Sequence, residues 1–428
     1  MTGAVALPAG HALRAVLNDE VHARPPEPLT APVRVSQLSL LESGGDAAWQ
    51  AVRRLTETYS IAPPPKDATH FSADFGPFRL KWERHTEFSR YTVFCPGEDA
   101  NTPAIAALPA DWVAGLPGEL VDAAHVVMLP GAGAPRDPAT IAGRFFGGGQ
   151  IIGSRLVDGR GMAFGDFRIH ADGFVPFLVL DDGMTPWQAG RIVQRLLEIE
   201  TYRIMALLAL PVARGLVPML TAQEEELAEI TASLLAGREA EEPALLARLT
   251  RLAAGTESRE ATNRYRFGAA AAYYDLVQTR IAELREGRIE GLQTFREFTE
   301  RRLAPAMNTC RAVAQRQEQL ALRIARATQL LSTRVDLTRQ QQNQVLLHSL
   351  DRSARMQLRL QETVEGLSVA AISYYVVGML AYVLRGAGAA GLPVAYDVLV
   401  AIAVPLVALL VYVGTRRLRH AAIRERAP

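Results

Sequence analysis

Two long apolar runs lie near the C-terminal end of the sequence. Leu367–Leu384 has 18 residues without a charge, and Val398–Gly414 is uncharged as well. A helix that crosses the ~30 Å hydrocarbon core of a bilayer needs about 20 largely apolar residues, and about 17 suffice at the short end. The pattern therefore predicts two transmembrane helices within residues 366–414. Only Arg385–Asp397 separates them, so we expect a hairpin that has the lipid bilayer as its partner.

Basic residues flank the predicted hairpin on one side. The loop between the spans carries only Arg385, whereas the outer flanks hold Arg352, Arg355, Arg359, Arg416, Arg417, Arg419, Arg424 and Arg426. Because basic residues stay on the cytoplasmic side, both termini are predicted to be cytoplasmic, with residues 415–428 as a basic tail. Met1–Gly10 has no signal-peptide pattern. Only Lys66 and Lys81 of the 46 basic residues are lysines, a usage typical of a high-GC bacterial genome, so we expect the bacterial inner membrane.

The first predicted span has one face of small residues. Gly366, Ala370 and Ser373 recur at i, i+4 and i+7, a spacing that permits close approach of a second helix or places hydroxyls along a pore. Tyr374 and Tyr375 lie in the middle of the span, too deep to anchor at the interface. A tyrosine hydroxyl in hydrocarbon needs a partner, so we expect these two to face a helix or a cavity, or to form a constriction.

A long helix is predicted to lead into the first span. Ala306–Glu365 contains no Pro or Gly, and Arg259–Glu286 upstream is also helix-like. At 1.5 Å per residue the longer stretch would form a stalk on the order of 90 Å long. Its apolar residues recur at helical spacing: Leu320, Ile324, Leu331, Val335, Val345, Leu350, Leu360 and Val364. Such helices are too polar to form a core alone, so we expect a coiled-coil pairing with each other or with neighbouring subunits, and hence a homo-oligomer.

The N-terminal half mixes strand and helix patterns. Alternation over His70–Phe94 predicts two antiparallel strands with one solvated face. Three further strands are expected over residues 149–180, with turns at Asp158-Gly159 and Asp172-Gly173. Helices are expected over Leu40–Tyr59, from the Thr185 N-cap to Leu210, and from a capping box at Thr221 and Glu224 to Gly237. The fold class is therefore an α+β cytoplasmic domain (residues 1–210), followed by a helical region with the long stalk (211–365) and the two-helix transmembrane hairpin (366–414).

Charge and motifs give little sign of chemistry. The 46 basic and 45 acidic residues leave a net charge of +1, which lacks the cationic excess of a nucleic-acid-binding protein. Cys95 and Cys310 give no disulfide framework. No metal-ligand or triad spacing occurs, so no catalytic residue, cofactor or metal site is predicted and we expect a protein that is not an enzyme. His85 lies beside Glu83 and Glu87, where a solvated surface and a site are both consistent with the pattern.

Three blocks of sequence resemble one family. LNDEVHARP at 17–25, HFSADFGPFRLKWERHTEFS at 70–89 and LQETVEGLSVAAISYYVVG at 360–378 are similar to the hallmark blocks of an uncharacterised bacterial family of membrane-anchored proteins, a domain of unknown function. The resemblance implies a membrane anchor and nothing about activity.

The layout of domain, stalk and two spans is also similar to the CorA-type magnesium channels, which are pentamers, and to a mitochondrial and yeast family linked to meiotic nuclear division. CorA-type channels carry Gly-Met-Asn at the outer end of the first span, whereas Gly378-Met379-Leu380 lies inside the span here. Two functions follow as expectations. The protein is a membrane homo-oligomer that transports ions, or a membrane-tethered cytoplasmic module that binds or scaffolds a partner, with the hairpin as anchor only.

Overall fold

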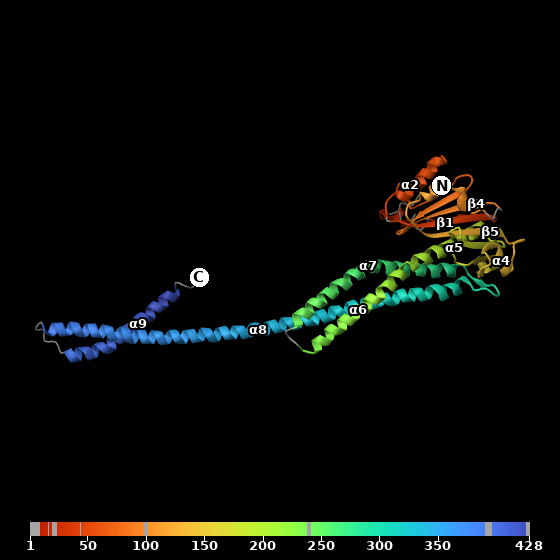
Figure 1. The fold of residues 1–428 in the computed structure, drawn as a ribbon. Coiled ribbons are helices and arrows are strands. Elements are labelled where there is room, and N and C mark those ends of the chain that lie inside the picture. The colour runs from red at the N-terminus through yellow and green to blue at the C-terminus, as the bar shows by residue number, and fades with distance from the viewer. Residues whose placement is uncertain are drawn as a thin grey trace. The chain divides into compact units, whose positions relative to one another are not determined.

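The computed structural model describes residues 9–15, 17–18, 24–42, 44–97, 102–237, 241–389 and 396–424 (Figure 1). By contacts the chain divides into two units, residues 1–328 and 329–428. The first unit is a mixed α/β domain with long helices, and the second contains apolar helical segments of membrane-spanning length.

The α/β domain is built on a nine-stranded sheet with the order β2-β3-β4-β1-β5-β8-β7-β6-β9. Neighbouring strands are antiparallel, except for the parallel pair β5 and β8. The strands are β1 (Val33–Leu41), β2 (His70–Asp74), β3 (Arg79–Arg84), β4 (Phe88–Pro96), β5 (Glu119–Pro130), β6 (Ile152–Leu156), β7 (Gly161–Gly165), β8 (Val175–Asp181) and β9 (Gly287–Arg288).

The helices of the described residues are short among the first strands and long from Pro186 onwards. They are α2 (Ala47–Thr58), α3 (Ala110–Ala114), α4 (Pro138–Phe145), α5 (Pro186–Leu207), α6 (Ala209–Leu235), α7 (Glu242–Glu283), α8 (Phe295–Ala389) and α9 (Tyr396–Arg424). Short 3-10 turns occupy Ala104–Ala107 and Val157–Gly159.

Two hydrophobic cores cover one face of the sheet. Under α2, the side chains of Val52 and Leu55 pack with Leu80, Trp82 and Tyr91 of the sheet. Beside α4, a second cluster joins Ile141 to residues of β7 and β8, namely Phe164, Leu178 and Leu180. Burial of these apolar side chains is the main favourable contribution to the folding of the domain.

Helix α5 belongs to the opposite side of the sheet, where its polar residues meet polar residues of the strands. Its start has the predicted capping box, in which Gln188 donates its backbone N–H to Thr185 Oγ1 at 3.3 Å. The helix ends at Leu207, close to the predicted Leu210. A Cβ at Gly190 would lie 1.8 Å from the carbonyl oxygen of Glu27, so only glycine allows this approach of the chain to α5.

Two predictions for the first hundred residues were wrong. The segment from Leu40 to Tyr59 begins in strand β1, and helix α2 starts only at Ala47. The stretch from His70 to Phe94 forms three strands, and β4 is buried at every position from Phe88 to Cys95. No solvated face is left on β4 because helices lie on both sides of it. The predicted Asp158-Gly159 hairpin between β6 and β7 is confirmed, with φ of 56° and 88° at the two residues.

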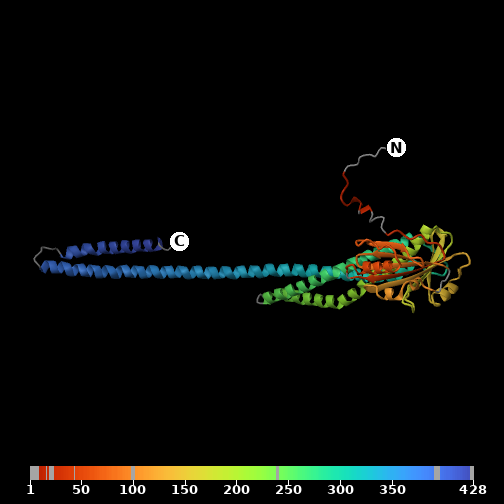
Figure 2. The same cartoon turned by 90° about the horizontal axis from the view of Figure 1, so that it is seen from above.

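Helices α6, α7 and the first part of α8 lie side by side (Figures 1 and 2). Gln223 of α6 donates to Thr256 of α7 at 3.1 Å, and Arg316 of α8 donates to Glu224 of α6 at 2.9 Å. The predicted capping box at Thr221 was wrong, because Thr221 is inside α6 and donates its hydroxyl to the carbonyl of Val217. Glu224 has the Arg316 ion pair instead, which lowers its pKa.

Helix α8 confirms the expected continuous helix, which begins at Phe295 and includes Pro305. The first half of the predicted apolar stripe is core, since Leu320, Ile324, Leu331 and Val335 are buried. Beyond Val335 no residue of α8 up to Gly386 is buried. The second half of the stripe is therefore left uncovered by this chain.

Three described helical stretches are long and apolar enough to cross a membrane: Pro186–Leu235, Phe295–Gly386 and Asp397–Arg417. The apolar window of the first is 33% buried, whereas the windows of the other two are 0% buried. The first stretch includes the apolar run Ile204–Ala213, in which Met205, Ala206, Ala209 and Ala213 are buried in the core.

Replacing Leu320 by Asp tests the packing of α8 in the α/β domain. Leu320 is 0% exposed, so a carboxylate there is desolvated without a partner and should lower the free energy of unfolding by about 3 kcal/mol or more. Urea unfolding of the purified chain measures the change. Leu322→Asp is the matched control, because Leu322 is 52% exposed and the same charge remains in water. Equal losses in the two variants would contradict the packing described for α8.

Candidate functional site

A chain of buried charges connects the sheet to the helices that cover it. Arg90 on β4 donates from Nε to Oε2 of Glu83 at 2.9 Å, and its Nη2 lies 3.7 Å from Oε1 of Glu198 on α5. Glu83 also pairs with Lys81 at 3.2 Å, and Glu198 accepts a hydrogen bond from Arg280 of α7. Removal of one member would leave a buried charge without its partner, which typically costs about 3–5 kcal/mol.

The electrostatics of this chain favour the ionised forms of Glu83 and Arg90. Burial alone would raise the pKa of Glu83, but Arg90 and Lys81 outweigh it and lower the pKa to about 2. The pKa of Arg90 is raised although burial opposes the charge, because Glu83 and Glu198 lie beside it. The cavity next to these groups has a volume of only about 20 Å³, room for about one water molecule. The charge chain is therefore a structural connection and has no space for a ligand.

A second buried polar group lies further along α5. Thr201 Oγ1 lies 2.7 Å from Oδ2 of Asp122 on β5, and Arg203 donates from Nε to Oε2 of Glu200 at 2.9 Å. Burial and the neighbouring Glu200 raise the pKa of Asp122 to about 7. Because the carboxylate of Glu200 pairs with the guanidinium of Arg203, this charged group can lie at the edge of the core.

Arg203 lines a polar pocket of about 340 Å³, which we call the cationic pocket. Its walls come from the segment after β7, from the end of α5 and from the first turns of α8. Its polar lining residues are Gln150, Asp166, Arg168, Arg203, Gln293, Thr299 and Arg302. The residues are mostly hydrogen-bond donors, with no nucleophile beside a general base, so the arrangement suits binding more than catalysis.

Aromatic contacts hold the cationic pocket together. Phe167 has a φ of 53°, which is uncommon for an aromatic residue. Its ring lies 5.1 Å from the guanidinium carbon of Arg203 and stacks on Phe298 of α8 with 4.8 Å between the ring centroids. Asp166 is bound on both oxygens, by the backbone N–H of Arg168 and by Nε2 of His170. These contacts fix the segment that carries Arg168.

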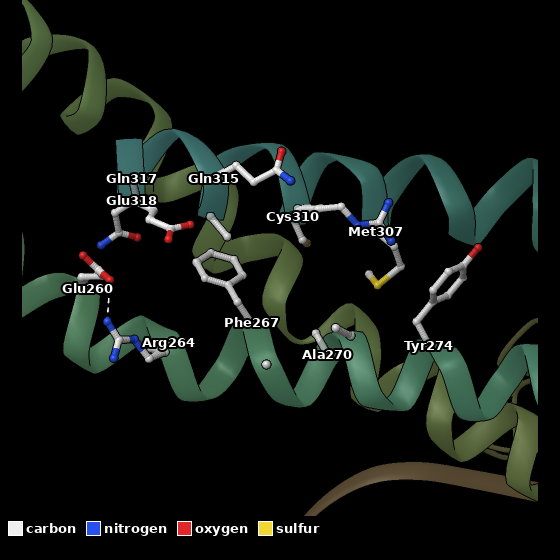
Figure 3. Close-up of a pocket in the computed structure, with 14 residues that line it drawn as sticks. Glu260, Arg264, Phe267, Ala270, Tyr274, Met307, Cys310, Gln315, Gln317 and Glu318 are labelled. Atoms are coloured by element: carbon white, nitrogen blue, oxygen red, sulfur yellow. Dashed lines mark hydrogen bonds and ion pairs between the residues drawn. The ribbon is translucent and has the colours of Figure 1, made fainter. Parts of the chain in front are cut away.

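An apolar groove of about 430 Å³ lies between α7 and α8. Figure 3 shows Phe267 and Ala270 of α7 opposite Met307 and Cys310 of α8, with Glu260, Arg264, Gln317 and Glu318 near one end and Tyr274 near the other. Burial raises the pKa of the Cys310 thiol, so it is a poor nucleophile. The groove offers an apolar surface without a reactive group.

The group around His85 is less exposed than a solvated surface would be. Glu83 belongs to the buried charge chain, and Glu87 accepts two hydrogen bonds from Arg266 at 2.8 and 3.3 Å. Burial and the nearby Arg90 lower the pKa of His85 to about 3, and its ring stacks on Phe88. Of the two interpretations left open for this group, a solvated surface does not fit, because Glu83 is buried and His85 and Glu87 are half-buried.

The predicted residues of the first span lie on α8 in the second unit. Gly366 and Ala370 are exposed, whereas Ser373 is half-covered and its Oγ has no hydrogen-bond partner. Tyr374 and Tyr375 are 77% and 72% exposed within the chain. Their role as a packing face, a pore or a constriction stays a prediction.

Sequence reasoning missed the cationic pocket. The three arginines lie far apart in the chain, at positions 168, 203 and 302, so no motif connects them. Among the residues that the structure describes, no group of three His, Cys, Asp or Glu side chains could hold a metal ion. The local signal that was available is Asp166-Phe167-Arg168 directly after a strand, which lies next to the predicted Asp172-Gly173 turn.

Replacing His85 by Phe tests its buried, neutral state. With a folded pKa of about 3 against an ordinary 6.5, the unfolded chain binds more protons between these values, so His85 reduces stability as pH falls from 6.5 towards 3. The variant keeps the ring contact with Phe88 and should show a flatter fall in the free energy of unfolding between pH 6.5 and 4.

Urea titrations followed by tryptophan fluorescence measure this slope. Asp122, with its raised pKa, changes stability in the opposite sense, but it is present in both proteins and cancels in the difference. An identical slope in both proteins would show that His85 titrates normally in the folded chain.

One family model matches this chain from residue 9 to residue 422, and its description is protein of unknown function (DUF3422). Nothing among the curated proteins matches the chain, and nothing among the solved structures does. The match includes all three sequence blocks that suggested an uncharacterised family. Because it spans nearly the whole chain, the protein belongs to the DUF3422 family.

Proposed function

We propose that the protein is a membrane-tethered cytoplasmic binding module, in which α8 and α9 anchor the chain and the α/β domain binds a ligand. The observation that carries the proposal is the contrast in burial: the apolar windows of α8 and α9 are 0% buried, against 33% for the α5–α6 stretch. Exposed apolar surface of this extent is unfavourable in water and is typical of a membrane-facing segment. The bilayer would provide the cover that the chain does not.

The proposed anchor is a two-helix hairpin. Support comes from residues on both helices that are only partly exposed and recur at helical spacing: Val369, Ser373, Val377 and Ala381 on α8, and Val400, Ala403, Val407 and Val411 on α9. Three of these residues, Ser373, Ala381 and Ala403, are small, and small residues let two helices approach closely in a membrane. Packing of this face of α8 against α9 explains why Ser373 is only partly exposed, and it does not require a pore.

The proposed orientation places both termini in the bacterial cytoplasm. The support is the arginine distribution, with Arg385 alone between the apolar segments and several arginines on each outer flank. The first unit, with Cys95 and Cys310 as free thiols, would then face the reducing side.

The proposed assembly is a homo-oligomer that pairs through α8. On a helix of 3.6 residues per turn, the exposed apolar residues between Val345 and Leu367 fall mostly within an arc of about 140°. Those within the arc are Val345, Leu346, Leu350, Met356, Leu360, Val364 and Leu367, each more than half exposed, whereas the exposed Leu347 and Leu358 lie outside it. This arc is distinct from the partly covered face of Val369 and Ser373, so one helix can pair with α9 and with a second copy at once.

Cysteine labelling tests the hairpin and its orientation. Gly386→Cys at the end of the α8 window should react with a membrane-impermeant maleimide in intact spheroplasts. Arg417→Cys, at the other end of α9, should react only after permeabilisation. Cys95 and Cys310 are buried and serve as the unlabelled background. Reaction of Arg417→Cys from outside would contradict the orientation, and reaction of both would contradict the hairpin.

The mass of the detergent-solubilised particle tests the assembly. Leu350→Asp places a charge in the exposed apolar arc and should dissociate the oligomer into smaller particles. His348→Asp is the matched control, because His348 is exposed on another side of the helix. A monomeric wild-type particle would contradict the oligomer, and cation flux through the wild-type protein in proteoliposomes would contradict a role limited to anchoring.

A further inference from the structure

The cationic pocket has an excess of positive charge. Its ionisable lining residues are Arg168, Arg203, Arg302 and Asp166, which give a formal charge of +2. Asp166 already accepts hydrogen bonds from the backbone of Arg168 and from His170. The carboxylate is therefore engaged by its neighbours, and the arginines dominate the field inside the pocket.

Two of the arginines are free to bind a ligand. Arg203 is paired with Glu200, but neither Arg168 nor Arg302 has a side-chain ion pair with any residue that the structure describes. A guanidinium presents several N–H donors in a planar fork that matches carboxylate and phosphate oxygens. The two unpaired forks line the same pocket from two different elements, one after β7 and one on α8, and together can bind an anion.

Thr299 provides an independent sign of a missing partner. The residue lines the pocket and is only 2% exposed, yet its Oγ1 has no hydrogen-bond partner. An unsatisfied buried hydroxyl is unfavourable, and in a folded protein it usually marks a position where a water or a ligand completes the bond. An anion held by Arg302, three residues along the same helix, would accept this hydrogen bond.

The walls also limit the rest of the ligand. Besides its polar groups the pocket is lined by Ile152, Phe167, Leu207, Phe298 and Leu303, so it has an apolar side next to the arginines. Its volume of about 340 Å³ is at the small end for ligand pockets. Phe167 is held in the left-handed region by its contacts with Arg203 and Phe298, and such strain is concentrated at binding sites.

We propose that the cationic pocket binds a small phosphomonoester, with the phosphate between Arg168 and Arg302 and the organic group against the apolar side. A phosphomonoester carries about −1.5 to −2 charges near pH 7, so it offers the two unpaired guanidiniums of Arg168 and Arg302 more negative charge than a single carboxylate does. The inference names the ligand of the binding domain and thus rests on the proposed function, but it does not depend on the anchor.

Calorimetry on the full-length protein in detergent tests the ligand class at pH 7.5. Three probes are compared: inorganic phosphate, phenyl phosphate and phenyl sulfate. Phenyl phosphate should bind about tenfold or more tightly than phenyl sulfate, which has the same shape with one negative charge, and more tightly than inorganic phosphate, which lacks the organic group. Equal affinities for phenyl phosphate and phenyl sulfate would overturn the phosphomonoester assignment.

Two variants test whether the ligand binds in the cationic pocket. Arg302→Gln should weaken phenyl phosphate about tenfold or more, because hydrogen bonds between charged partners are strong, whereas Arg301→Gln, at a neighbouring position outside the pocket lining, should not. Thr299→Val should also weaken binding, yet leave the melting temperature of the free protein equal or higher because an unsatisfied hydroxyl is gone. Lower thermal stability with unchanged affinity would show that Thr299 has a structural role and would overturn the site.

The outcome is distinguishable from failure of the proposed function. If none of the three probes binds, the pocket is not an anion site, whatever the labelling of the anchor gives. If phenyl phosphate binds with the predicted variant pattern while cysteine labelling rejects the hairpin, the ligand assignment stands and the anchor does not.

Discussion

The contact on which the α/β domain depends is the burial of Arg90 between Glu83 and Glu198. Arg90 joins β3 and β4 to α5, and Glu198 forms a second ion pair with Arg280 of α7. Because these charges are out of water, each needs its partner in place, and the helices can approach the sheet in one arrangement only. The other face of the sheet, with Trp82 and Tyr91, is held by apolar packing that is less directional. Apolar side chains are buried on both sides of the sheet, and the buried charges add directional contacts on the α5 side.

The cationic pocket is a consequence of that geometry. Arg203 lies at the end of α5 and is held by Glu200, so its position follows from the way α5 lies on the sheet. Phe167 connects it to α8 through the stack with Phe298. The capping of α8 is equally well defined, since Glu286 accepts from the backbone N–H groups of Phe295 and Arg296. A pocket whose walls are fixed on three sides can present its donors in advance, which lowers the cost of binding.

Helix α8 has a partly buried first part and an exposed second part. Up to Val335 one face of α8 is buried, with Leu320, Ile324, Leu331 and Val335 on it, and from there to Gly386 none of its residues is buried. An α-helix satisfies its own backbone hydrogen bonds, so it can continue from a packed environment through water and into lipid without a break. The same helix provides Thr299 and Arg302 to the pocket and the apolar window proposed to enter the membrane. Any ligand held by its first turns would be in direct contact with the element proposed to form the anchor.

The sequence by itself determined the features that depend on neighbouring residues. The Asp158-Gly159 turn, the cap at Thr185, the continuous helix after Pro305 and the uncharged runs near the C-terminus all follow from local preference and composition. Only the tertiary structure decided that Val33–Leu41 lies inside the sheet between β4 and β5, that β4 is buried on both faces, and that Gly287–Arg288 pairs with β6 at the sheet edge. It also brought Arg168, Arg203 and Arg302 together. The physical reason is that burial and charge pairing act between residues that are distant in the chain. The sequence pattern around one residue therefore does not identify the residue that it contacts.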